Sequence, residues 1–301
     1  MILSQSPRQK LLELLCILTG GLLILYSLVR IPFLPHSSSS PVALPPIPQL
    51  SADVYLVRLI GGTNTLFTRK EWKPVAPASL TKLMTALVAE KLIPAKTPIV
   101  FSKEAKTIQE VGEKISPIPT EKQISKEAAI DLALVASAND AARALAQAAG
   151  RNLGGRNYAE GLSQFMIEME KQREKLGMTH SHFENPVGLD AEGHVATAEN
   201  LATLIEYIWY NHPLLLNRTR QNEITISTDN HTYIMESTNE LLKEFPAILG
   251  GKTGFTDNAQ GALILVYPTR LGRPAIIVLM KSPDRFGDGR KIINWIETNL
   301  N

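Results

Sequence analysis

A serine and a lysine stand three residues apart in the segment Pro77-Ala-Ser79-Leu-Thr-Lys82. On a helix this spacing places the two side chains on one face, with their Cβ atoms about 5–6 Å apart. A serine hydroxyl becomes a good nucleophile beside a proton acceptor, and lysine accepts a proton near neutral pH when burial or a nearby positive charge lowers its pKa. The segment therefore fits acyl transfer through Ser79, although a surface helix with an exposed lysine would show the same spacing.

Two later segments carry polar side chains that fit the same chemistry. Ser137-Ala-Asn139 lies in an interruption between two predicted helices, where such residues also serve as ordinary helix caps. Lys252-Thr253-Gly254 follows two glycines and precedes an apolar strand. Glycine allows a ligand to approach the backbone, while the lysine and threonine offer a cation and a hydroxyl to a carboxylate. The alternative for this segment is a solvated strand edge.

The elements that must position these residues follow from hydrophobic periodicity and capping residues. A helix is predicted to start near Ser79 and to run through residue 92, because apolar residues recur at helical spacing after Pro77. Further helices are expected over 126–136, over 141–149 with Asp140 as N-cap and Gly150 as C-cap, over 158–176, over 198–211, and around Ile292–Leu300. Strands are expected over 53–60, 65–68, 223–227, 231–235, 262–267 and 275–281.

Strands at both ends with helices between them predict one antiparallel sheet, built from the two ends of the domain, plus a helical subdomain. The three polar segments occur in the order Ser79-x-x-Lys82, Ser137-x-Asn139 and Lys252-Thr-Gly254, which is the signature of penicillin-binding proteins and serine β-lactamases. The chain resembles the low-molecular-mass penicillin-binding proteins, the serine-type D-alanyl-D-alanine carboxypeptidases. The resemblance covers residues 51–301 and is strongest over 77–86, 183–190, 238–242 and 251–256.

This resemblance implies an α+β fold of the DD-peptidase/β-lactamase type. Its five-stranded antiparallel sheet is flanked by helices, and the site lies between the sheet and a helical subdomain. Ser79 is then expected to attack the penultimate D-alanine of a peptidoglycan stem peptide, while neutral Lys82 accepts its proton. Ser137 would pass a proton to the departing D-alanine. β-Lactams mimic the scissile amide, so they should acylate Ser79 too.

The resemblance also assigns residues that bind the substrate around Ser79. The oxyanion would be held by the backbone N–H groups of Ser79 and Phe255. The remaining assignments are Asn139 for the amide of the acyl peptide, Lys252 and Thr253 for the terminal carboxylate, Gly254 for close backbone approach, and Arg285 as a further cation beside the carboxylate. No cofactor and no metal are expected.

The chain departs from the family pattern at two places, and rival functions use the same residues. Ala138 stands where the family usually has glycine, and Asn258-Ala-Gln-Gly261 replaces a more usual Ala-Gly pair. A zinc peptidase would use His180-x-His182, Asp190 and His194, but no His-Glu-x-x-His segment exists. A β-lactamase would need an acidic deacylation base that is not seen between the second and third motifs. A DD-endopeptidase and a non-catalytic wall-binding protein remain alternatives.

The N-terminal residues predict attachment to a membrane. Residues 11–29 are almost all apolar and lie between Arg8 and Lys10 on one side and Arg30 on the other. We expect an uncleaved signal anchor after a cytoplasmic tail of residues 1–10, with a cleaved signal peptide as the alternative. Residues 30–50 include six prolines and four consecutive serines, which predict an extended linker. The expected location is therefore the bacterial plasma membrane, with a single span and the domain 51–301 outside the cytoplasm.

Charge and cysteine content exclude several other classes. The formal net charge of +2 equals that of the first thirty residues, so the remainder is neutral and has no charge surplus for binding nucleic acid. The single cysteine, Cys16, lies in the predicted anchor. Residues 51–301 therefore offer no cysteine nucleophile, internal disulfide or cysteine-ligated zinc.

Overall fold

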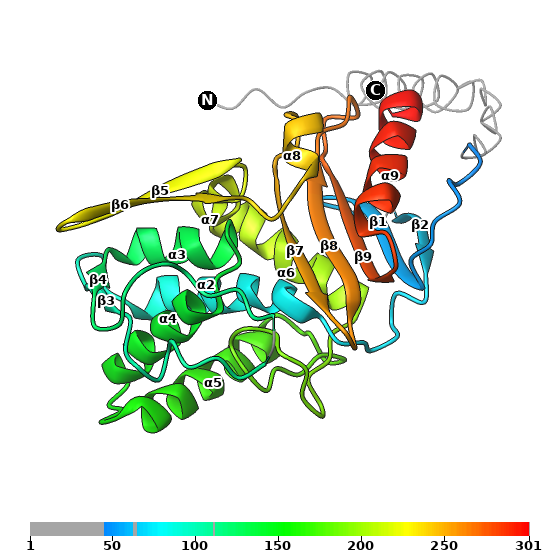
Figure 1. Ribbon diagram of the computed structural model, residues 1–301. Coiled ribbons are helices and arrows are strands. Elements are labelled where there is room, and N and C mark those ends of the chain that lie inside the picture. The colour runs from blue at the N-terminus through cyan, green and yellow to red at the C-terminus, as the bar shows by residue number, and fades with distance from the viewer. Residues whose placement is uncertain (1–44, 63–64, 111, 301) are drawn as a thin grey trace, which may run out of the picture. The chain divides into compact units, whose positions relative to one another are not determined.

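A five-stranded antiparallel sheet forms the centre of the domain in the computed structural model, which describes residues 45–62, 65–110 and 112–300 (Figure 1). The first and last strands of the described residues are neighbours, with Val54 opposite Met280. The prediction of one sheet built from the two ends of the domain is therefore confirmed. The strand order is β2 (Thr65–Arg69), β1 (Val54–Leu59), β9 (Ala275–Ser282), β8 (Gln260–Tyr267), β7 (Gly250–Thr256).

Helices cover both faces of this sheet because its central strands are apolar on both sides. Alternate residues of a strand point to opposite faces, so Ile264 and Val266 join one core while Leu263 and Leu265 join another. The first core contains residues of α2 (Thr81–Leu92) and α6 (Ala198–Asn211), and the second contains residues of α8 (Leu241–Glu244) and α9 (Arg285–Asn299). The predicted α+β architecture is confirmed.

The helical subdomain lies beside β7 and continues the first of these cores (Figure 1). Its main helices agree with the predicted ones to within a few residues, and α6 has the predicted bounds because the Thr197 side chain accepts a hydrogen bond from the Asn200 N–H. Four short elements were not predicted: β3 (Ile99–Val100), β4 (Gln123–Ile124), α7 (Pro213–Arg218) and α8. The other elements are η1 (Ala78–Leu80), α3 (Lys126–Leu134), α4 (Asn139–Asn152), α5 (Tyr158–Lys175), β5 (Glu223–Thr228) and β6 (His231–Glu236).

Two predicted caps of α4 are wrong. Gly150 does not end the helix, which continues to Asn152. A Cβ at Gly150 would lie 1.8 Å from the carbonyl oxygen of Gly161 on α5, so this glycine allows two helices to pack closely. Asp140 is not the N-cap, because α4 starts at Asn139 after Ala138. The buried Asp140 carboxylate instead accepts hydrogen bonds from the backbone and side chain of Ser116.

The N-terminal predictions lie mostly outside the described residues, since the predicted tail, the anchor and most of the linker fall within residues 1–44. The last residues of the predicted linker contact α9. The Trp295 indole donates a hydrogen bond to the Pro46 carbonyl, and Lys291 donates to that of Gln49. Within the part of the chain that the structure describes, every helix is too short or too polar to cross a membrane.

Candidate active site

Ser79 and Lys82 face each other at the junction between η1 and α2. Lys82 Nζ lies 2.7 Å from Ser79 Oγ and donates a second hydrogen bond of 2.7 Å to the carbonyl oxygen of Val187. Burial of Lys82 lowers its pKa to about 7, and the positive charge of Arg143 acts in the same direction. Near neutral pH a large fraction of Lys82 is therefore unprotonated and can accept the Ser79 proton.

The peptide that joins Ala78 to Ser79 is held tightly between two glycines. Ala78 has φ of +49°, an unfavourable value for a residue with a Cβ. A Cβ at Gly188 would lie 1.9 Å from the Ala78 carbonyl oxygen, and a Cβ at Gly254 would lie 3.0 Å from the Ser79 nitrogen. The loop before α6 and the edge strand β7 thus both approach Ser79 through glycines, and neither position has room for a larger side chain.

The second and third motifs meet through a hydrogen bond between Ser137 and Lys252. Ser137 lies between α3 and α4 with φ of +61°, and its Oγ accepts a 2.8 Å hydrogen bond from Lys252 Nζ. Lys252 also donates to the carbonyl oxygen of Thr253 at 2.9 Å. Burial, followed by the positive charges of Lys82 and Lys114, lowers the pKa of Lys252 well below its usual value. The structure therefore joins residues that are 115 positions apart in the chain.

Strand β7 is an edge strand, and its free edge carries the backbone groups of Thr253 and Phe255. Its Gly251 N–H points away from β8, because it donates to the side chain of Thr219. Backbone direction alternates along a strand, so the Phe255 N–H points to the same free edge. Because Gly254 lies against Ser79, this N–H is on the side of the sheet edge where Ser79 lies. That placement suits the predicted pair of oxyanion donors.

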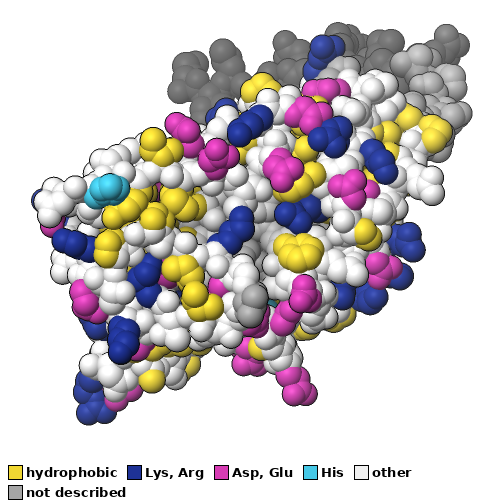
Figure 2. Space-filling view, viewed as in Figure 1, with side chains coloured by type: hydrophobic (Ala, Val, Ile, Leu, Met, Phe, Trp, Pro, Cys, Tyr) yellow, Lys and Arg dark blue, Asp and Glu magenta, His cyan; other side chains and the backbone are white. Residues whose placement is uncertain are grey.

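These residues line a cleft of about 610 Å³ between the sheet and the helical subdomain. Figure 2 shows positive and negative side chains close together in the middle of this face. Seven of the nine predicted site residues line the cleft directly, while Lys82 and Lys252 are buried behind its wall. The seven are Ser79, Ser137, Asn139, Thr253, Gly254, Phe255 and Arg285.

The less specific predictions, Asn139 and Arg285, also fall in this cleft. Asn139 is the first residue of α4, and its N–H donates to the Lys114 carbonyl at 2.7 Å. Arg285 starts α9, with its guanidinium 4.5 Å from the Phe286 ring centre and 5.8 Å from that of Phe255. Burial lowers the pKa of Arg285, and its Nε is buried without a hydrogen-bond partner. The Arg285 guanidinium thus lies beside two aromatic rings and lines the cleft.

Several residues of the site were not predicted from the sequence. Thr238 Oγ1 lies 2.5 Å from Thr253 Oγ1, and Lys114 lines the cleft from the opposite wall. Asp190 accepts a 2.8 Å hydrogen bond from Thr256, which ties the loop before α6 to β7. The only sequence signal in the segment 238–242 is its resemblance to the family. The carbonyl of Val187 has no sequence signal, because any residue carries one.

The four residues of the zinc alternative do not converge. His182 lies between the carboxylates of Glu170 and Glu184, His180 packs against the Trp72 ring, and Asp190 binds Thr256. His194 is buried and contacts Thr81. Over residues 45–62, 65–110 and 112–300 there is no group of three or more histidine, cysteine, aspartate or glutamate side chains arranged to hold a metal ion.

Comparisons with known proteins agree with this geometry. A family model described as D-alanyl-D-alanine carboxypeptidase matches residues 42–284. The chain is 30% identical to the D-alanyl-D-alanine carboxypeptidase DacF of Bacillus subtilis over 206 residues, which is 66% of this chain and 50% of that protein. It is 29% identical to the D-alanyl-D-alanine endopeptidase of Escherichia coli over 283 residues, covering 90% of this chain and 86% of the relative. The chain thus spans half the length of the Bacillus relative.

A solved structure shares the fold. The Streptomyces K15 DD-transpeptidase superposes with a TM-score of 0.76 at 21% identity, covering 84% of this chain and all of that one. This likeness concerns the fold, which is that of the DD-peptidases.

Proposed function

The chain belongs to the D-alanyl-D-alanine carboxypeptidase family, and from this premise we propose that it removes the terminal D-alanine of peptidoglycan stem peptides through an acyl-enzyme on Ser79. The observation that carries the proposal is the 2.7 Å contact between Ser79 Oγ and a fully buried Lys82 whose pKa is about 7. A serine hydroxyl beside a neutral amine is an activated nucleophile.

Acylation follows from the positions of these groups. Neutral Lys82 takes the Ser79 proton while Oγ attacks the carbonyl carbon of the penultimate D-alanine. Negative charge then develops on the carbonyl oxygen, where the N–H groups of Ser79 and Phe255 stabilise it. The hydrogen bond from Lys82 to Val187 holds the amine against Oγ before the reaction begins, so little reorganisation is needed.

Departure of D-alanine needs a proton on its amine nitrogen. Ser137 lines the cleft and accepts a hydrogen bond from Lys252, so its own hydroxyl proton is free to pass to the leaving nitrogen, and the proton that Lys82 took from Ser79 would then replace it on Ser137. Asn139, at the start of α4, would hold the amide of the acyl peptide. Water then hydrolyses the ester on Ser79 and returns the enzyme with a peptide one residue shorter. A β-lactam would follow the same first step.

The terminal carboxylate would lie against Thr253 and the Arg285 guanidinium, with Lys252 buried behind Thr253. We expect Arg285→Ala to lower kcat/KM for a D-Ala-D-Ala peptide about tenfold or more, mainly through KM, because a charge-assisted hydrogen bond to the carboxylate is lost. Arg290→Ala is the matched control, since Arg290 is an exposed residue of α9 that pairs with Glu244. An equal effect of both changes on KM would contradict the role of Arg285.

The function is tested by incubating the protein with benzylpenicillin and measuring its intact mass. We expect one added penicillin mass, located by peptide mapping on the fragment that contains Ser79. Free D-alanine should also be released from a peptide ending in D-Ala-D-Ala, and a chelator should not inhibit that release. Adduct without D-alanine release would indicate the non-catalytic alternative, and absence of both would overturn the proposal.

A DD-endopeptidase is a second candidate because two relatives with that name are covered nearly to their full length. They are the proteins of Escherichia coli and Pseudomonas aeruginosa, of which 86% and 83% are covered. An endopeptidase would cut a cross-linked dimer of stem peptides with the same serine. Comparing kcat/KM for the dimer and for a D-Ala-D-Ala peptide distinguishes the two activities.

We propose further that residues 11–29 anchor the domain to the outer face of the bacterial plasma membrane. The length and hydrophobicity of this segment and the charges around it support the proposal. Fractionation tests it, because the full chain should sediment with membranes and a chain lacking residues 1–44 should not.

A further inference from the structure

The peptide unit between Ala78 and Ser79 carries one of the two proposed oxyanion donors. A trans peptide is planar, so its C=O and N–H point in opposite directions. Whatever fixes the direction of the Ala78 carbonyl therefore also fixes the direction of the Ser79 N–H. The backbone at Ala78 does not prefer its conformation, since φ is +49°, so surrounding contacts must hold it.

The side chain of Thr81 forms a hydrogen bond with the Ala78 carbonyl. Its Oγ1 donates a 2.8 Å hydrogen bond to the Ala78 oxygen, and the Thr81 side chain is completely buried. The same Oγ1 lies 2.9 Å from Nε2 of His194, which comes from the loop before α6, 113 positions away. His194 is 2% exposed. A hydroxyl has one proton to donate, so the protonation of the imidazole decides which way this hydroxyl points.

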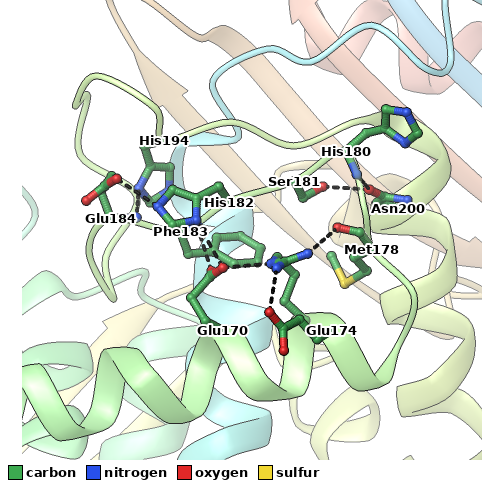
Figure 3. A network of polar contacts seen from close by, with 11 residues as sticks. Glu170, Glu174, Met178, His180, Ser181, His182, Phe183, Glu184, His194 and Asn200 are labelled. Carbon is green, nitrogen blue, oxygen red and sulfur yellow. Dashed lines mark hydrogen bonds and ion pairs between the residues drawn. The ribbon is translucent and has the colours of Figure 1, made fainter.

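The surroundings of His194 settle that protonation. The backbone N–H of Glu184 points at Nδ1 from 3.1 Å, and a backbone N–H can only donate, so Nδ1 is the acceptor. Figure 3 shows His194 and Glu184 together on this loop. Burial lowers the pKa of His194 to about 4, so the ring is neutral at pH 7. Its single proton is on Nε2 and is donated to Thr81, whose own proton must then go to the Ala78 carbonyl.

We propose that His194 is a positioning residue for catalysis: acting through Thr81, it fixes the peptide plane whose N–H, on Ser79, binds the oxyanion. The chain of donors runs from the Glu184 N–H to His194, then to Thr81 and to the Ala78 carbonyl. Gly188 packs against the same carbonyl, and Gly254 lies close to the Ser79 nitrogen. This inference rests on the proposed function and adds to it how one oxyanion donor is aimed.

The test measures the rate constant for acylation by benzylpenicillin separately from the constant for its initial binding. Thr81→Val keeps the shape of the side chain and removes the hydroxyl, and His194→Phe removes the donor from the ring. Each is expected to slow acylation about tenfold with little change in initial binding, because one oriented hydrogen bond is lost. The double variant should be no slower than the slower single variant, since both changes break one chain of contacts.

Two conservative variants should restore the rate. Thr81→Ser keeps the hydroxyl, and His194→Gln places an amide N–H about where the imidazole Nε2–H lies. His182→Gln is the matched control, because His182 lies on the same loop but contacts the carboxylates of Glu170 and Glu184 (Figure 3). It should acylate at the wild-type rate.

Three results would contradict the role of His194 and Thr81. Wild-type acylation by folded Thr81→Val, additive effects in the double variant, or equal losses in Thr81→Ser and Thr81→Val would overturn it. If His194→Phe does not fold, the Thr81 pair still tests the hydroxyl, and a loss in His194→Gln equal to that in Thr81→Val would contradict the role of the ring N–H. Failure of the proposed function is distinct, because the wild-type protein itself would then form no adduct.

Discussion

Replacement of Ser79 by alanine is expected to abolish the penicillin adduct and to reduce D-alanine release by a factor on the order of 10⁴ or more. The reason is that alanine has no Oγ to form the ester, and loss of a nucleophile has effects of this size in serine peptidases. The fold should survive, because the hydroxyl contributes one hydrogen bond to Lys82. Intact mass and D-alanine release measure the result.

The matched control for this change is Ser163→Ala, since Ser163 is an exposed serine of α5 away from the cleft. It should form the adduct like the wild-type protein. An adduct on Ser79→Ala of the same mass and yield as on the wild-type protein would show that another residue is the nucleophile.

Replacement of Lys82 by glutamine should lower the rate constant of acylation about 10³-fold, because the amide cannot accept the serine proton. In the wild-type protein this rate should rise with pH through about 7, where Lys82 loses its proton. The variant should lack that step in its pH profile. Lys91→Gln, a change of an exposed lysine on α2, is the control and should keep both the rate and the step.

Lys82→Gln should also change how the free energy of unfolding depends on pH. The pKa of Lys82 is about 7 in the folded protein and 10.5 when unperturbed, so between these values the unfolded chain binds more protons. Wild-type stability should therefore rise with pH over this window, by up to about 5 kcal/mol, and that gain is absent below pH 7. Lys82→Gln should lack this rise. If the free energies of unfolding of the two proteins changed equally between pH 6 and 9, the lowered pKa of Lys82 would be contradicted.

Local sequence signals were sufficient to predict the main elements and the three motifs. The end of α5 and the start of α6 lie within a residue of their predicted bounds, because Gly177 follows α5 with a positive φ and the Thr197 side chain caps α6. The prediction from Gly150 was wrong because this glycine does not cap a helix. It allows close contact with Gly161, and a contact between two helices leaves no local signal in either segment.

The parts of the site that were missed depend on contacts between distant segments. Lys82 is oriented by the carbonyl of Val187, 105 positions away, and a carbonyl looks alike in every sequence. In the sequence, His194 near an aspartate fits the pattern of a zinc ligand. In the fold it is buried against Thr81, and the Glu184 N–H decides which of its nitrogens carries the proton. Neither contact follows from spacing along the chain.

The pairing of β1 with β9 has a consequence for the order in which the domain folds. Val54 pairs with Met280, about 226 residues later in the chain, and closing so long a loop slows folding. Strand β7 with Lys252 also belongs to the last fifty or so residues, so a growing chain holds Ser79 and Lys82 long before it holds the other wall of the cleft. Reactivity towards penicillin should therefore be acquired late, after the C-terminal strands have joined the sheet.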